Sequence, residues 1–389
     1  MEERLWIACS DGEVEEVIKL LQNEQLNTNW QDDEYSRTPF YIACENGYIE
    51  IVKLLLNDTR IDINQPTNYS VTPLLIACWE RHIEIVKLLV NDKRVDINKG
   101  DNDSVTPFYV SCEEGYIEIV KLFLNDKRMV DINKAANGGL TPFFIACSEG
   151  HLEIVKLLLN DNRIDIDEAD ADGFTPFYIA CENGHIEIVK LLLNDQRVDI
   201  NNTNEYDCTP FFIACWQGRI GVVKLLLNDN RFDVNKAENE YGQTPFYIAC
   251  ENGHLETIKL LLNNNRIDIN QPINDGRTPF YIACYKGQIE IMKHLLACGK
   301  EIDMNKRDNN GKTGLDRAKE KEKMEMNEWE TEEKFQERKS EYKKIVELIE
   351  SFERDPNETR LQLRVQLGLA GKSLFFYFLI SYSKKKFFF

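Results

Sequence analysis

Hydrophobic and polar positions recur along the chain with a period of 34 or 35 residues. In residues 38–64, one apolar cluster covers residues 40–44, and a second apolar stripe follows between residues 49 and 56 with the spacing of one helix face. Residues 60–64 then alternate polar and apolar side chains, and a turn rich in Asn, Asp, Gly and Ser follows. Each period therefore predicts a short helix, a turn, a second helix and an extended hairpin.

Local residue signals mark the ends of these predicted helices. Thr38 offers a hydroxyl that caps a helix start, and Pro39 suits the first helical position, where an N–H is not needed. Gly47 suits the left-handed conformation that ends a helix. The Thr-Pro pair recurs at positions 38–39, 72–73, 106–107, 141–142, 175–176, 209–210, 244–245 and 278–279.

A period of this length predicts a solenoid, because one helix pair cannot bury its apolar face alone and stacked pairs form a continuous core. We expect an all-α fold of about ten stacked units. Residues 1–37 are expected to form an N-terminal capping repeat, and residues 38–312 eight full repeats. Residues 313–353, with their charged helix, are expected to form a degenerate C-terminal cap. Residues 354–389 are expected to form a disordered or weakly amphipathic tail.

The unit resembles the ankyrin repeat, whose signature is Thr-Pro-Leu-His-x-Ala, then Gly-His, a leucine-rich helix and Ala-Asp-Val-Asn. Residues 175–181 have the sequence Thr-Pro-Phe-Tyr-Ile-Ala-Cys, followed by Gly184-His185 and by Val-Asp-Ile-Asn at 198–201. The departures are systematic: the family histidine is Tyr, Phe or Leu, and the second alanine is Cys. One extra residue after the second helix lengthens the family's period of about 33 residues. The resemblance covers about residues 5–353.

The eleven cysteines and five histidines give little support to catalysis or metal binding. Nine cysteines occupy one small-residue position of successive units, where they are too far apart for disulfides and suit a buried role. We expect Cys208 and Cys298, which lie outside this position, to be more exposed. The glycine-rich stretch 368–373 lacks the first glycine of a phosphate-binding loop, because residue 366 is Gln. We therefore expect no enzyme activity, no cofactor and no metal.

The resemblance implies that a protein partner docks in a concave groove lined by the hairpin tips and the exposed ends of the first helices. Carried over by position, the two residues after each repeat cysteine and the residue before each Thr-Pro face this groove. The candidate binding residues are Glu45, Trp79, Glu80, Glu113, Glu114, Glu149, Phe174, Glu182, Trp216, Glu251 and Tyr285. Such a row of carboxylates and aromatic side chains suits a basic or extended partner. The alternative is that these glutamates only keep the surface soluble.

Trp79 and Trp216 replace glutamate at equivalent positions four units apart, so we expect them to anchor one long partner across about 40 Å. A net charge of −19 argues against nucleic acid as a partner. Unpaired thiols and an acidic N-terminus without a signal peptide favour an intracellular, cytoplasmic monomer.

The sequence thus predicts a non-catalytic scaffold that binds a protein partner and no small-molecule substrate. One alternative is a membrane-peripheral adaptor attached through residues 361–389, although the apolar stretch there is much shorter than the roughly 20 residues of a membrane span. A further alternative is a subunit that recruits substrates to an enzyme complex.

Overall fold

The computed structural model describes residues 1–126, 128, 130–326 and 329–369. Within these ranges all regular elements are helices, and the segments predicted as extended hairpins are turns and bends without strands. The predicted all-α fold of stacked helix pairs is confirmed. The count of about ten units and the domain boundaries stay predictions.

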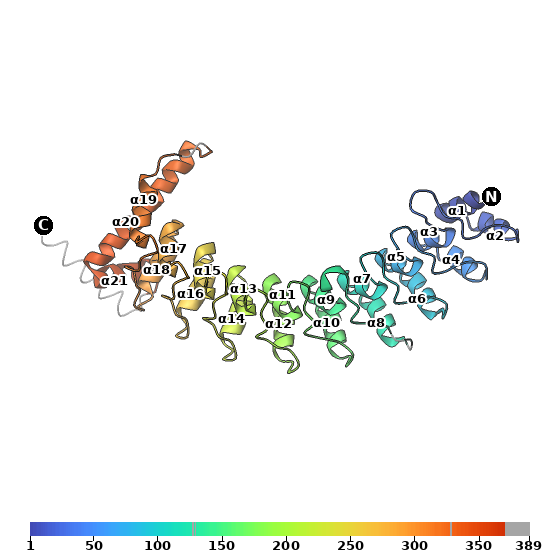
Figure 1. Cartoon of the computed structure of the whole chain (residues 1–389), viewed down its shortest axis with the longest axis horizontal. Helices are drawn as coiled ribbons and strands as arrows, with labels where there is room; N and C mark the ends of the chain where they lie inside the picture. The colour runs from blue at the N-terminus through green and yellow to red at the C-terminus, as the bar shows by residue number, and fades with distance from the viewer. Residues whose placement is uncertain (127, 129, 327–328, 370–389) are drawn as a thin grey trace. The chain divides into compact units, whose positions relative to one another are not determined.

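The chain forms two compact units, of which the N-terminal one comprises Met1–Ala180 and Glu187–Asp199. Its helices stack in two rows, with the first helix of each pair in one row and the second helix in the other (Figure 1). The first helices are α1 (Glu2–Asp11), α3 (Pro39–Glu45), α5 (Pro73–Trp79), α7 (Pro107–Glu113) and α9 (Pro142–Glu149). The second helices are α2 (Val14–Leu21), α4 (Ile49–Leu56), α6 (Ile83–Asn91), α8 (Ile117–Asn125) and α10 (Leu152–Leu159). A short 3-10 turn, η1 (Asn137–Gly139), precedes α9.

The C-terminal unit comprises Cys181–Ile186 and the residues from Ile200 onward. Helices α11 (Pro176–Asn183) and α12 (Ile186–Leu193) lie where the two units meet in the sequence. The helix pairs of the C-terminal unit are α13 (Pro210–Trp216) with α14 (Ile220–Leu227), α15 (Pro245–Asn252) with α16 (Leu255–Leu262), and α17 (Pro279–Tyr285) with α18 (Ile289–Ala297). Helices α19 (Gly314–Lys323), α20 (Glu332–Arg354) and α21 (Pro356–Gln366) follow, and α21 packs against α18 and α20.

The predicted helix ends are confirmed in detail. The hydroxyl of Thr38 accepts a hydrogen bond of 3.1 Å from the backbone N–H of Tyr41, as a capping threonine does at a helix start. The equivalent bond is made by Thr72, Thr106, Thr141, Thr175, Thr209, Thr244 and Thr278. Gly47 follows α3 with φ at 78°, in the left-handed region that favours glycine. Arg81 takes the same position after α5 with φ at 58°, where a side chain is strained.

The core consists of the inward faces of both helix rows. Phe40, Cys44 and Leu55 are at most 1% exposed, and the equivalent residues of later repeats repeat this burial. All eleven cysteines are free thiols, and ten of them are buried. Cys208 is more exposed than the nine periodic cysteines, as expected, but at 5% against 0% the difference is small and Cys208 is still buried. Its N–H donates to Asn204 Oδ1 at 2.9 Å. Cys298 is half-buried, as expected.

A ladder of asparagine side chains joins successive turns between the helix pairs. The side-chain amide of Asn64 donates to the carbonyl of Arg94 at 2.7 Å, and its oxygen accepts from the N–H of Asp96 at 2.8 Å. Asn29, Asn133, Asn235 and Asn270 make the same two bonds to the turn that follows each of them. An amide suits this position because it offers one donor and one acceptor to two backbone groups.

Asp167 stands at this ladder position in place of asparagine. One of its oxygens accepts from the N–H of Asp199 at 2.8 Å, while the other, Oδ1, is buried without a hydrogen-bond partner. An ionised carboxylate has no donor and cannot complete the pair of bonds that asparagine makes. Burial raises the pKa of Asp167, and the carboxylates of Asp199, Asp165 and Asp195 raise it further.

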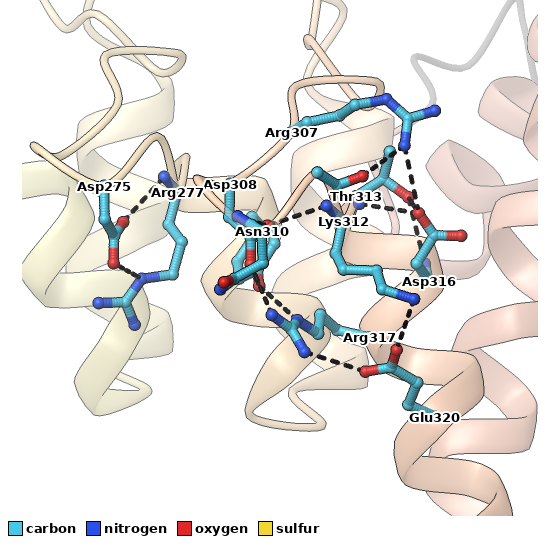
Figure 2. A network of polar contacts seen from close by, with 12 residues as sticks. Asp275, Arg277, Arg307, Asp308, Asn310, Lys312, Thr313, Asp316, Arg317 and Glu320 are labelled. Carbon is cyan, nitrogen blue, oxygen red and sulfur yellow. Dashed lines mark hydrogen bonds and ion pairs between the residues drawn. The ribbon is translucent and has the colours of Figure 1, made fainter.

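At the C-terminal end, a buried carboxylate ties α17 to α19 (Figure 2). Asp308, 7% exposed, accepts from the guanidinium of Arg317 at 2.7 Å, as Figure 2 shows. It accepts from the hydroxyl of Tyr281 at 2.7 Å as well. It also accepts from the N–H groups of Asn310 and Lys312, each at 2.9 Å. Burial opposes ionisation of Asp308, but these hydrogen bonds outweigh it and hold its pKa well below the ordinary value. This network stabilises the start of α19 against α17.

The Asp167→Asn variant is expected to be more stable than the wild type by about 1 kcal/mol at pH 7, because the amide completes the ladder bonds. Because the pKa of Asp167 is raised in the folded state, the free energy of unfolding of the wild type increases as the pH falls through that pKa. The advantage of the variant should therefore shrink in urea unfolding at pH 5. The converse variant, Asn133→Asp, should lose a similar amount at pH 7. Unchanged unfolding midpoints for both variants would contradict a stabilising role of the asparagine ladder.

Candidate functional site

At the start of several second helices, a side-chain donor reaches back to the end of the first helix of the preceding repeat. His82, His151 and His254 place Nε2 at 2.9, 2.7 and 2.7 Å from the carbonyl oxygens of Glu45, Glu113 and Trp216. A carbonyl oxygen only accepts, so each Nε2 carries the proton of its bond.

Other residue types fill the same position in other repeats and make the same bond. Tyr116 donates to Trp79, Arg219 to Glu182 and Gln288 to Glu251, over 3.4, 2.7 and 3.2 Å. On α20, the hydroxyl of Tyr342 donates to the carbonyl of Tyr285 at 2.7 Å, so this helix takes the role of a second helix. These bonds fix the backbone of residues predicted to line the groove.

Five of the predicted residues lie at the C-terminal ends of three neighbouring first helices, α5, α7 and α9. We call them the acidic–aromatic cluster: Trp79, Glu80, Glu113, Glu114 and Glu149. Trp79 is 36% exposed, whereas Glu113 is half-buried and the other three glutamates are exposed.

Within the described residues, the carboxylates of this cluster have no neutralising partner. Among the residues that the structure describes, none of these four glutamates forms an ion pair with a basic side chain. Burial raises the pKa of Glu113, and the charges of Glu114 and Glu149 raise it further. Carboxylates that repel one another in this way are stabilised by any cation placed between them.

Glu45 differs, because a cation of the same chain already faces it. Arg37, in the loop before α3, lies 3.5 Å from Glu45 and 2.8 Å from Asp32. Its guanidinium also stacks over the rings of Trp6 and Tyr35, at 5.3 and 5.0 Å from their centroids. Burial raises the pKa of Glu45, and Arg37 counteracts this effect.

Phe174, the remaining candidate of the N-terminal unit, is half-buried. Its ring packs on that of Tyr178 with 4.9 Å between centroids.

In the C-terminal unit, most candidate side chains also have partners within the chain. Glu182 accepts from Gln217 at 3.2 Å, and Glu251 accepts from Gln243 at 3.0 Å. Tyr285 is half-buried, and Lys321 lies 4.7 Å above its ring. Trp216 packs edge-on against Phe212 but remains 43% exposed.

The expected span of about 40 Å between Trp79 and Trp216 stays a prediction, because these two residues lie in different units.

Four exposed tyrosines at the tips of the loops are absent from the candidate binding residues that the sequence predicted. Tyr35 and Tyr69, 38% and 59% exposed, belong to adjacent loops, and their ring centroids are 6.4 Å apart. Tyr206 and Tyr241 hold the same position in the C-terminal unit and are 47% and 54% exposed. Each lies three residues before a Thr-Pro pair, where other loops have Asp or Gly. An aromatic residue at this turn position was the signal that could have revealed them.

The described residues offer neither a candidate metal site nor a candidate membrane-spanning helix. In the described part of the chain, no three His, Cys, Asp or Glu side chains gather closely enough to hold a metal ion. None of the helices described is long and apolar enough to cross a membrane. The apolar stretch within residues 370–389 lies outside the described residues.

A family model described as ankyrin repeats (3 copies) matches residues 5–101, 94–170, 162–238 and 230–308. None of the curated proteins matches the chain.

Replacing His151 by phenylalanine should lower the free energy of unfolding by about 1 kcal/mol, because the carbonyl of Glu113 loses its donor while a ring remains in place. The His151→Gln variant retains a donor, as Gln288 does naturally, and should lose less than half as much. Urea unfolding curves of both variants measure the difference. Equal losses would mean that ring packing, and not the hydrogen bond, matters at this position.

Proposed function

This chain belongs to the ankyrin-repeat family, and from that premise we propose that it is a non-catalytic scaffold that binds a protein partner through the acidic–aromatic cluster. Ankyrin repeats indicate a protein–protein interaction domain, and such repeats are generally non-catalytic modules. Stacked repeats offer extended surfaces for this purpose. The cluster, rather than the whole predicted groove, is the centre of the proposed site.

The observation that carries this proposal is the contrast among the predicted glutamates. Glu45 and Glu251 already face Arg37 and Lys286 of the same chain, at 3.5 and 3.9 Å. The four glutamates of the cluster have no such ion pair within the described residues and lie beside a partly exposed tryptophan. Tryptophan is frequent among residues that dominate binding energy, and unpaired carboxylates favour basic partners. The proposed partner is therefore an extended segment rich in Lys and Arg.

The proposed compartment and the exclusion of nucleic acid as a partner follow from the composition of the chain. Eleven free thiols favour a reducing, intracellular compartment, and the net charge of −19 disfavours nucleic acid. Recruitment of substrates to an enzyme complex would use the same surface, so it differs from simple scaffolding only in the identity of the partner.

The direct experiment compares partner capture by variants with equal changes in charge. The cluster variant is Glu113→Gln/Glu114→Gln/Glu149→Gln, and the control variant is Glu84→Gln/Glu118→Gln/Glu153→Gln, which removes three exposed carboxylates from second helices. Immobilised proteins are incubated with a cell extract, and bound proteins are quantified by mass spectrometry. We expect a partner that the wild type and the control variant retain and the cluster variant loses. A partner that all three proteins retain equally would contradict the proposed site.

For a partner found in this way, the three cluster substitutions should weaken binding by about tenfold at low salt, since exposed charge pairs contribute about 0.2–1 kcal/mol each. Wild-type binding should also weaken with added salt. As the pH falls, binding should begin to weaken above the ordinary glutamate value of 4.5, because the raised pKa of Glu113 means that its charge is lost early. Titration calorimetry over salt and pH measures both effects. Affinity independent of salt and pH would exclude the electrostatic part of the proposal.

Truncating Trp79 to alanine should cost about 2 kcal/mol or more of binding energy if its indole is an anchor. The melting temperature should stay unchanged, because the side chain is 36% exposed and its backbone carbonyl still accepts from Tyr116. A lowered melting temperature with full affinity would instead assign Trp79 to packing between repeats.

A further inference from the structure

A groove opens on the second-helix row of the C-terminal unit, between the ends of α16 and α18 and the segment after α21. Its volume is about 280 Å³. Its lining residues include Leu262, Asn263, His294, Cys298, Leu367 and Leu369. Leu369 is 45% exposed and Cys298 is half-buried, so apolar surface at this groove remains uncovered by the described residues.

The chain itself leads into this groove. Helix α21 is anchored on α18, because Leu363 is 3% exposed and Arg360 donates to the carbonyl of Leu296 at 3.3 Å. The N–H of Leu369 donates to the carbonyl of Arg364 at 2.7 Å and folds the chain back after the helix. Residue 369 is thus held at the rim, and residues 370–389, outside the described part, continue from there.

Those residues contain the strongest apolar run of the sequence. Residues 374–380 are Leu-Phe-Phe-Tyr-Phe-Leu-Ile, without any charged group. The five Cα-to-Cα steps from residue 369 to residue 374 can span at most about 17 Å, which keeps the run close to the groove. A short tether of this kind gives an effective concentration in the millimolar range, so even weak apolar contacts favour docking within one molecule.

We propose that residues 374–380 dock in this groove and cover the end of the second-helix row. Leu367 and Leu369 already line the groove, so docking would extend a contact that the same chain has begun. A lipid surface or a second copy of the chain would compete for the same apolar run, and the experiment distinguishes them.

Cys298 provides a native reporter of this docking. It lines the groove and is half-buried, whereas the ten other cysteines are buried. The rate at which a thiol-reactive disulfide reagent modifies Cys298 is measured in the full chain and in Phe375→Ser/Phe376→Ser/Phe378→Ser. The matched control is Phe387→Ser/Phe388→Ser/Phe389→Ser, which makes the same chemical change beyond the proposed segment.

The first variant should react about tenfold faster or more, as expected when a tethered segment mostly occupies its site, and the control should react like the wild type. Equal rates in all three proteins would overturn the proposal, and co-sedimentation of the wild type with phosphatidylcholine–phosphatidylserine vesicles would then assign the run to a lipid surface. Protection of Cys298 that increases with protein concentration would also overturn it, in favour of a second copy.

A second measurement covers the case in which Leu369 alone shields Cys298. With Phe376→Cys, mild oxidation should join Cys298 and the new thiol in a disulfide within one chain, whereas Phe387→Cys should give little of it. Equal cross-linking from both positions would show that the segment has no preferred site and would contradict docking.

Discussion

The arrangement of the helix pairs in this protein depends on hydrogen bonds that pass from most pairs to the pair before them. A helix pair with two small apolar faces has no core of its own, so its position is set by its neighbours. Stacking of Phe40, Cys44 and Leu55 with their counterparts excludes water, but apolar burial is non-directional. Directional bonds, such as the one from His151 to the carbonyl of Glu113, define that rotation.

This constraint explains a variation that looks arbitrary in the sequence. His, Tyr, Arg and Gln share little chemistry apart from a donor on a side chain long enough to reach the neighbouring repeat. The same constraint links stability to the proposed function, because the carbonyl groups that accept these bonds belong to residues of the acidic–aromatic cluster and its counterparts. The backbone at the surface is thereby held in place, and the outward side chains of Trp79 and Glu113 are free to serve a partner. Because the backbone of the site is already ordered before a partner binds, binding costs less conformational entropy.

The periodic features could be predicted from the sequence, whereas the pairings between distant side chains could not. Thr38, Pro39 and Gly47 act within a few residues of themselves, so their roles follow from local backbone chemistry. The bond from Tyr342 to Tyr285 joins residues 57 positions apart and lies outside the period, so the sequence gives no spacing from which to infer it. The pairing of Glu45 with Arg37 and the burial of Cys208 likewise depend on how loops fold over the helices. The positions proposed for the site came from the family pattern, but their division into paired and unpaired carboxylates required the structure.

The central claim is that a partner binds at the ends of α5, α7 and α9, and amide hydrogen exchange tests it most directly. Exchange is compared between the free chain and its complex with the partner identified by capture. If the partner binds at the ends of α5, α7 and α9, residues 79–81, 113–116 and 149–151 gain protection, and α6, α8 and α10 change little. Protection confined to those second helices, or to the C-terminal unit alone, would contradict the account.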